Sequence, residues 1–282
     1  MQLALCVLYE LHYRGFSDVH SDREWDPELI RLRSIFEERF LDYLRQNCEY
    51  GDDAFEEMEA LSIEPTSGKG VSWHLKDEGS WEQMREYLAH RSLYHLKEAD
   101  PHSWAIPRIH GQAKASFVSV EFDEYGAGRG ERVHQQLWTN LMEAASLDPS
   151  YLGYINNAPG ETLATVNIMS LFGLHRSLRG ATVGHFAATE ITSSPGSARL
   201  AAALRRLNAP TDCTHFYLEH VEADAVHEQV MRHNVVGELL RFEPELASDV
   251  VFGMRALSHL DTISNQQIMS AWQRGASSLV KA

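Results

Sequence analysis

The sequence predicts an all-α protein that folds as a multi-helix bundle. Apolar residues recur at three-to-four spacing along most of the chain, and the alternating pattern of a β-strand is almost absent. Prolines and glycines interrupt the helical pattern at intervals that suit single helices. The 282 residues, of which 44% are hydrophobic, suffice for one large domain or two small ones with a buried core.

Two helices are expected near the start of the chain. The apolar run at the N-terminus predicts an amphipathic helix rather than a signal peptide, because it has no basic start and meets Glu10 early. A second helix is expected over residues 27–46, where Pro27 follows Asp26 and provides a good start signal.

A connection and then a series of helices are expected after residue 48. The acidic stretch 49–64 is expected to be a solvated helix or loop, and the polar, glycine-bearing stretch 64–80 an irregular connection. Pro195 is expected to separate two of the helices that follow. These helices are predicted at about 80–98, 107–125, 129–147, 160–175, 177–193, 196–207, 211–232 and 244–275.

Several glycines fall inside the predicted helices. Those at 173, 180 and 184 lower helix stability there, so they suggest close backbone packing or a bend. No repeat or linker divides the chain. We therefore expect residues 1–80 to be a helical extension packed on a core of residues 81–282, together forming one structural unit.

Composition excludes several classes of partner. A net charge of −15 argues against nucleic acid and against an anionic membrane surface, because phosphate binding needs clustered Lys and Arg. No stretch approaches 18 uncharged apolar residues, so no membrane span is expected. Three widely spaced cysteines form neither a disulfide framework nor a zinc ribbon, which favours the cytoplasm. The sequence leaves open whether the protein forms a homodimer.

A group of three side chains near residue 220 has the spacing of metal ligands. His220, Asp224 and His227 are offset by four and seven residues, which places them within a fan of roughly 60° on an α-helix. Iron accepts imidazole nitrogen together with carboxylate oxygen. The pattern also arises by chance on solvated helix faces, so it needs partners elsewhere in the chain.

Periodicity offers two partners for a further histidine, His134. Glu131 lies three residues before it, as in the paired ligands of ferritin-like bundles, and Asp224 and His227 form a second such pair. Glu124 lies ten residues before His134, across a glycine-rich stretch. The spacing alone does not choose between Glu124 and Glu131.

Three segments carry a resemblance to a known family. DEYGAGRGERVH, LFGLHRSLRGATVGHFAATEITSS and HVEADAVHEQV, in this order and spacing, resemble the haem-oxygenase-like di-iron oxidases. The likeness is greatest to the branch of iron-containing redox enzymes, and it covers about residues 90–255. It implies a haem-oxygenase-like helical bundle with an N-terminal helical extension.

The resemblance also implies a ligand set. It makes Glu124 a metal ligand that would bridge two metals, and it does not make Glu121, one turn earlier, a ligand. Glu131 would lie at the surface or contact the ligands without binding metal. It places an additional carboxylate, taken from an earlier helix in some members, at Glu98, which could equally be an ordinary exposed acid at a helix end. The implied metal ligands are Glu98, Glu124, His134, Glu190, His220, Asp224 and His227.

The implied activity is that of an O₂-dependent, non-haem di-iron oxidoreductase. Two Fe ions and the co-substrate O₂ would form a peroxo-diferric species that attacks a small organic substrate in an apolar cavity between helices. Family chemistry implies an amino-acid-like or fatty-acid-like substrate, and repeated turnover implies an external electron donor. Four carboxylates would balance two Fe²⁺ ions, so the helix around 211–232 is expected to become ordered when metal binds.

Three alternative functions remain at this stage. A ferritin-like iron oxidase or storage protein would use Glu131 with His134. A metal-free enzyme of the haem-oxygenase fold would need no clustered ligands, and a helical interaction protein would need no site at all. Among the other histidines, His90, His95 and His102 are expected at the surface, and His185 is expected to pack or to form hydrogen bonds.

Overall fold

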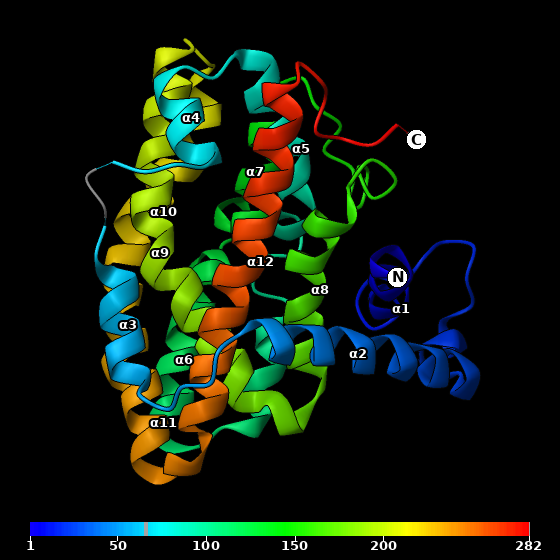
Figure 1. Ribbon diagram of the computed structural model, residues 1–282, viewed down its shortest axis with the longest axis vertical. Helices are drawn as coiled ribbons and strands as arrows, with labels where there is room; N and C mark the ends of the chain where they lie inside the picture. The colour runs from blue at the N-terminus through cyan, green and yellow to red at the C-terminus, as the bar shows by residue number, and fades with distance from the viewer. Residues whose placement is uncertain (65–66, 282) are drawn as a thin grey trace.

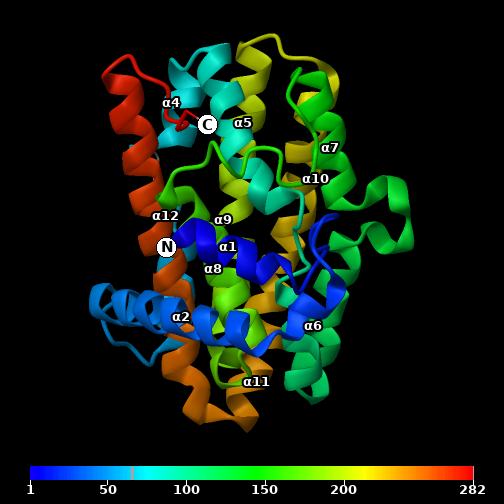
Figure 2. The same cartoon turned by 90° about the vertical axis from the view of Figure 1, so that its right-hand side faces the viewer.

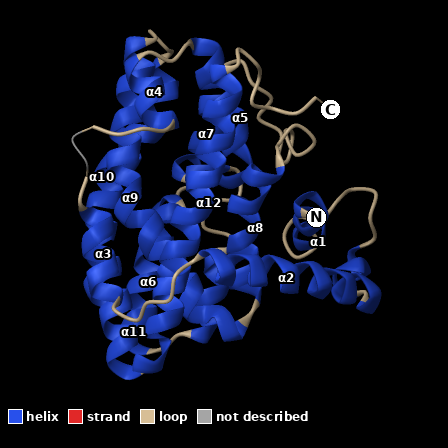
Figure 3. Cartoon of the chain, viewed as in Figure 1, coloured by secondary structure: helices blue, strands red, loops and turns tan. Residues whose placement is uncertain are grey.

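The computed structural model describes residues 1–64 and 67–281, and these residues form α-helices without any β-strand (Figures 1 and 3). The predicted all-α class is confirmed for the described residues. The α-helices are α1 (Gln2–Glu10), α2 (Pro27–Asn47), α3 (Ala54–Ser62), α4 (Val71–Asp77), α5 (Trp81–His95), α6 (Gly111–Glu124), α7 (His134–Ala144), α8 (Gly160–Leu174), α9 (Arg179–Arg206), α10 (Thr211–Gln229), α11 (Gly237–Phe242) and α12 (Ala247–Gln273).

Two local predictions were wrong. The stretch 64–80, expected to be irregular, contains α4, because Val71 and Leu75 are one turn apart and are buried against α9. Residues 65–66 of that stretch lie outside the described residues. The expected break at Pro195 is absent, since α9 continues through it from Arg179 to Arg206.

Helix α9 is the centre of the bundle, with its most extensive contacts to α10 and α12 (Figures 1 and 2). Glycines allow α9 and α12 to touch through their backbones. A Cβ atom on Gly184 would lie 1.9 Å from the carbonyl oxygen of Val250, and one on Gly253 would lie 2.1 Å from that of Ala181. The close packing predicted at Gly184 is therefore confirmed, and α9 is held at a fixed distance from α12.

The N-terminal helices share the core of the bundle. Figure 2 shows α1 and α2 running across the long direction of the other helices. Leu5 and Tyr9 of α1 pack in one cluster with Phe172 of α8, and Met58 of α3 packs with Phe186 of α9. None of the described helices is both long and apolar enough to span a membrane.

Candidate metal centre

The loop between α6 and α7 brings the first two candidate ligands together. Glu124 is the last residue of α6 and His134 the first of α7. Between them, Gly126 and Gly128 adopt positive φ angles of 68° and 78°, which glycine tolerates best. A Cβ on Gly126 would lie 2.6 Å from the backbone of Arg132, so the loop folds closely on itself. As a result, Nδ1 of His134 lies 2.8 Å from Oε2 of Glu124.

The seven side chains expected to bind metal lie together in the interior. They form two groups of four, and within each group one ligand atom per residue lies within 4.8 Å of all the others. Glu124 belongs to both groups, so it lies where a bridging carboxylate would. The first group is Glu98, Glu124, His134 and His220, and the second is Glu124, Glu190, Asp224 and His227.

The three candidate ligands of α10, which are His220, Asp224 and His227 (the α10 triad), are divided between the two groups. His220 belongs to the group of Glu98, which follows the end of α5, and its Nε2 lies 3.8 Å from Oε2 of Glu98. His227 lies one to two turns further along, with its Nδ1 3.0 Å from Oε2 of Glu190 and 3.7 Å from Oε1 of Glu124. Asp224, between them, is 2% exposed. The helix continues beyond His227 as a π-helical segment, η6 (Val230–Val236), a type of distortion frequent at functional sites.

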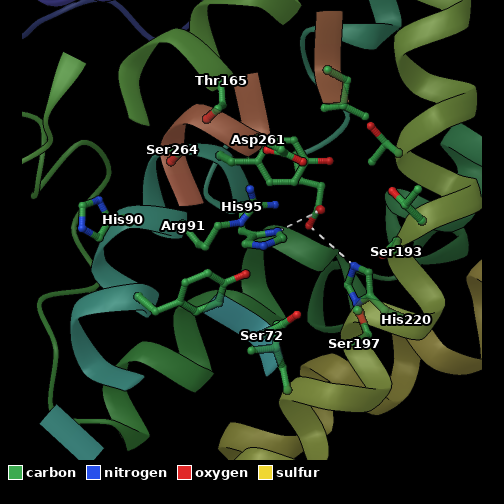
Figure 4. A pocket seen from close by; sticks show the side chains of 18 of the residues that line it. Ser72, His90, Arg91, His95, Thr165, Ser193, Ser197, His220, Asp261 and Ser264 are labelled. Atoms are coloured by element: carbon green, nitrogen blue, oxygen red, sulfur yellow. Dashed lines mark hydrogen bonds and ion pairs between the residues drawn. The ribbon is translucent and has the colours of Figure 1, made fainter. Parts of the chain in front are cut away.

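Neighbouring groups hold two of the ligands in place. Nδ1–H of His220 donates to the carbonyl of Phe216 at 2.8 Å, which leaves Nε2 directed at the centre. Nδ1 of His95 forms a 2.9 Å hydrogen bond with Oε1 of Glu98, which leaves Oε2 of that carboxylate for the centre. The dashed lines in Figure 4 follow these contacts of His95 and His220 with the carboxylate between them.

Several buried ligand atoms have no hydrogen-bond partner among the described residues. A buried polar atom without a partner destabilises the folded protein, and such atoms rarely cluster. Here the atoms belong to the two groups that share Glu124, and imidazole nitrogen together with carboxylate oxygen is a donor set that iron accepts. The residues therefore fit a pair of metal ions. The atoms concerned are Oε2 of Glu98, Nε2 of His220, and Oδ1 and Oδ2 of Asp224.

Protons bound to histidines partly balance the negative charge of the carboxylates in this centre. Burial disfavours a charged imidazole, but Asp224 and Glu190 raise the pKa of His227 to about 11. In the same way burial is outweighed by Glu98, which raises the pKa of His220 to about 10. Burial and then the charge of Asp224 raise the pKa of Glu190 to about 8. Both histidines are thus imidazolium ions at neutral pH, where metal would otherwise supply the positive charge.

Some residues of the centre were not expected from the sequence. His95 was expected at the surface but is 6% exposed and bonds to Glu98; His90 and His102 are likewise buried. Glu98 lies beyond the end of α5 at His95, so helical spacing did not indicate this contact. Asp123, whose side chain is half exposed, lies 3.2 Å from Nε2 of His227.

Two acids near the loop have different surroundings. Glu131 is exposed and belongs to neither group of ligands. Glu121 is 2% exposed, both of its oxygens lack a partner among the described residues, and burial raises its pKa well above the usual range. Glu121 is therefore a buried acid close to the centre, outside the two ligand groups. His185 forms the expected hydrogen bond, with His102 at 3.0 Å.

A cavity of about 220 Å³ adjoins the centre, and Figure 4 shows part of its wall. The expectation of an apolar cavity was wrong. Hydroxyl groups and two opposite charges line much of it, because α9 turns a polar face toward it. The cavity-lining residues of that face are Thr189, Thr192, Ser193, Gly196, Ser197 and Leu200, at helical spacing.

Comparison with known proteins identifies the family. The chain is similar to nitrosourea synthase from Streptomyces achromogenes subsp. streptozoticus, with 25% identity over 145 residues. That match covers 51% of this chain and 31% of the relative, so the chain spans about a third of the relative's length. A family model described as iron-containing redox enzyme matches residues 85–262, well over half of the chain. The protein therefore belongs to the iron-containing redox enzyme family, and the resemblance predicted from its sequence is confirmed.

Proposed function

We propose that the protein is an O₂-dependent oxidoreductase with two iron ions bound by the seven clustered side chains. The observation that carries this proposal is the pair of four-residue ligand groups that share Glu124. A single metal site would need no second buried group of acids beside it. Iron bound there would supply electrons for the reduction of O₂.

The remaining side chains would prepare the site for that chemistry. His95 and the carbonyl of Phe216 orient Glu98 and His220, so that one remaining polar atom of each side chain is available to a metal. Burial raises the pKa of Glu121, which favours its protonated form close to the ligands. The cavity beside the centre gives room for a small organic substrate. We further propose that an external electron donor restores the reduced state after each turnover.

The burial of the ligands and the family membership favour this function over its rivals. A ferritin-like centre would use Glu131, which is exposed and outside both groups. A metal-free enzyme or an interaction protein gives no reason for so many unpartnered buried ligand atoms. The related protein is named a synthase, which supports an enzyme rather than a storage protein.

The test is anaerobic loading with Fe²⁺, followed by rapid mixing with O₂. We expect about two irons per chain, in line with two four-residue groups, and a transient absorption band after mixing. His215→Gln is the matched control for His227→Gln, because His215 is an exposed histidine on the same helix. Only the second substitution should reduce iron content. Iron far from two per chain, or no transient, would contradict the proposal.

A further inference from the structure

The candidate ligand Glu98 lies in an irregular turn rather than in a helix. Helix α5 ends at His95, and in the turn that follows, residues 96–101, Ala99 has a φ of 72°. This left-handed conformation is unfavourable for a residue with a Cβ atom, so it persists only where surrounding contacts hold it. Residues from other parts of the chain therefore fix the position of the Glu98 carboxylate.

The first of these contacts is a buried ion pair with the N-terminal helix. Lys97 is 2% exposed, and its Nζ lies 2.9 Å from Oε2 of Glu10, the fully buried last residue of α1. The hydroxyl of Tyr151 donates to the same oxygen at 2.9 Å, and the Lys97 ammonium lies 4.1 Å from the centre of the Tyr13 ring. Because Lys97 and Glu98 are consecutive, this pair fixes the backbone directly before the ligand.

A second contact from the same part of the chain reaches the backbone of Glu98 itself. Nη2 of Arg14 donates to Oε1 of Gln135 at 2.7 Å, and Nε2 of Gln135 donates to the backbone carbonyl of Glu98 at 2.9 Å. Arg14 also donates through its backbone N–H to Oε1 of Glu10 at 3.1 Å. Residues 10 and 14 therefore hold the turn by two routes, one through Lys97 and one through Gln135.

The turn is connected to two further ligands through their neighbours in sequence. Tyr125, which follows Glu124, donates from its hydroxyl to Oδ1 of Asp100 at 2.9 Å. Gln135, which donates to the turn, follows His134 directly. Movement of the turn would therefore change the distances within the first ligand group. The second group takes no residue from the turn.

We infer that Glu10 and Lys97 are positioning residues for the first ion, the one bound by the group that contains Glu98. Removal of either partner would leave the other as an unpaired buried charge. Loss of the contacts that hold a metal ligand typically lowers metal affinity by about 10-fold to 100-fold. The inference rests on the proposed function. It extends the metal centre to α1, which lies before residue 85, where the family match begins.

The alternative is that the ion pair only stabilises the fold. A buried ion pair contributes little net stability, and its replacement by uncharged side chains of similar volume is often neutral. Glu10→Gln combined with Lys97→Met (the neutral pair) makes that replacement and leaves no unpaired charge. A purely structural ion pair predicts wild-type metal binding by the neutral pair. A positioning role predicts that the neutral pair folds but binds the first ion weakly.

The test is anaerobic titration of the full chain with Fe²⁺, followed by calorimetry. The wild type should bind two ions. The neutral pair should bind one ion with wild-type affinity and the first ion about 10-fold to 100-fold more weakly. Lys97→Arg keeps the positive charge beside Glu10, so it should bind the first ion more tightly than the neutral pair. Wild-type affinity of the neutral pair for both ions would overturn the inference.

Matched controls come from the same N-terminal helices. Nε of Arg33 lies 3.2 Å from Oε1 of Glu37, and neither side chain has a hydrogen bond or ion pair with the described residues 96–101. Arg33→Met combined with Glu37→Gln should therefore retain both ions. Arg14→Gln should weaken the first ion, whereas Arg31→Gln, a change at an exposed arginine of α2, should not. Equal weakening of the first ion by the Arg33 and Glu37 control would refute the assignment.

Hydrogen exchange of the metal-free protein separates this inference from the proposed function. The amides of residues 96–100 should exchange at least about tenfold faster in the neutral pair than in the wild type, while those of α12 keep their rates. If the wild type binds no iron, the proposed function fails, but this comparison still reports on the turn. Equal exchange at residues 96–100 in both proteins would contradict the positioning role, whether or not iron binds.

Discussion

Iron binding to this protein should depend steeply on pH, because metal must replace protons in the centre. In the metal-free protein the pKa of His220 is raised to about 10 and that of His227 to about 11. Both imidazoles are therefore protonated at every pH up to about 9. A metal ligand must be unprotonated, so both protons leave when metal binds. Affinity thus rises with pH and falls as the solution becomes more acidic.

The size of the effect follows from the number of protons. Two protons released per filled centre change the binding constant about 100-fold per pH unit, which is about 2.7 kcal/mol. Glu190, with its pKa raised to about 8, contributes part of a third proton below that pH. Between pH 6.5 and 7.5 the overall constant for two ions should therefore rise about 100-fold to 1,000-fold.

Anaerobic calorimetry can count these protons. Fe²⁺ is titrated into the protein at both pH values, in two buffers that differ in ionisation enthalpy, and the difference in heat gives the number of protons released. His215→Gln serves as the control and should release the same number as the wild type. A binding constant that does not change with pH, or release of fewer than one proton per filled centre, would refute the reasoning.

Three further predictions concern the ligands, the helix packing and the order of α10. Glu124→Ala should abolish binding of both irons, since Glu124 belongs to both groups, whereas Glu131→Ala should retain two irons per chain by metal analysis. Gly184→Ala should lower the free energy of unfolding by about 1–3 kcal/mol in urea titrations, because its Cβ would meet the backbone of α12. Gly196→Ala in the same helix meets only the end of a flexible arginine at 3.8 Å and should be neutral or stabilising by up to about 1 kcal/mol. Amides of residues 211–232 should exchange at least about tenfold more slowly once iron is bound, as measured by hydrogen exchange, and identical rates would contradict metal-dependent ordering.

The helices were largely predictable because their apolar spacing is regular. Prediction failed where packing between distant segments decides the outcome. Proline removes one backbone hydrogen bond from a helix, and from sequence Pro195 therefore ends one. In the structure, buried residues on both sides of it, such as Ile191 and Leu200, pack against neighbouring helices and keep α9 continuous. The short helix α4 depends in the same way on its contact with α9.

In the candidate site, too, some features could be predicted from the sequence and others could not. The α10 triad could be found from its spacing, since its members share one helix. The choice of Glu124 over Glu131 could not, because it depends on the left-handed turn at Gly126 and Gly128 that reverses the chain. The role of His95 was hidden because α5 is buried on most of its faces, so no polar side distinguishes an inward histidine from an outward one.

The contacts of α4 and of the C-terminal segment bear on how much of the chain the cavity needs. The family match begins at residue 85 and ends at residue 262. Yet Ser72 forms part of the cavity wall from before that stretch. From after it, Ser278 donates through its backbone N–H to Glu86 and is hydrogen-bonded to His90. A fragment trimmed to the matched residues would keep all seven candidate ligands but lose these contacts and the buried residues of α1 to α4, so it should be much less stable than the full chain.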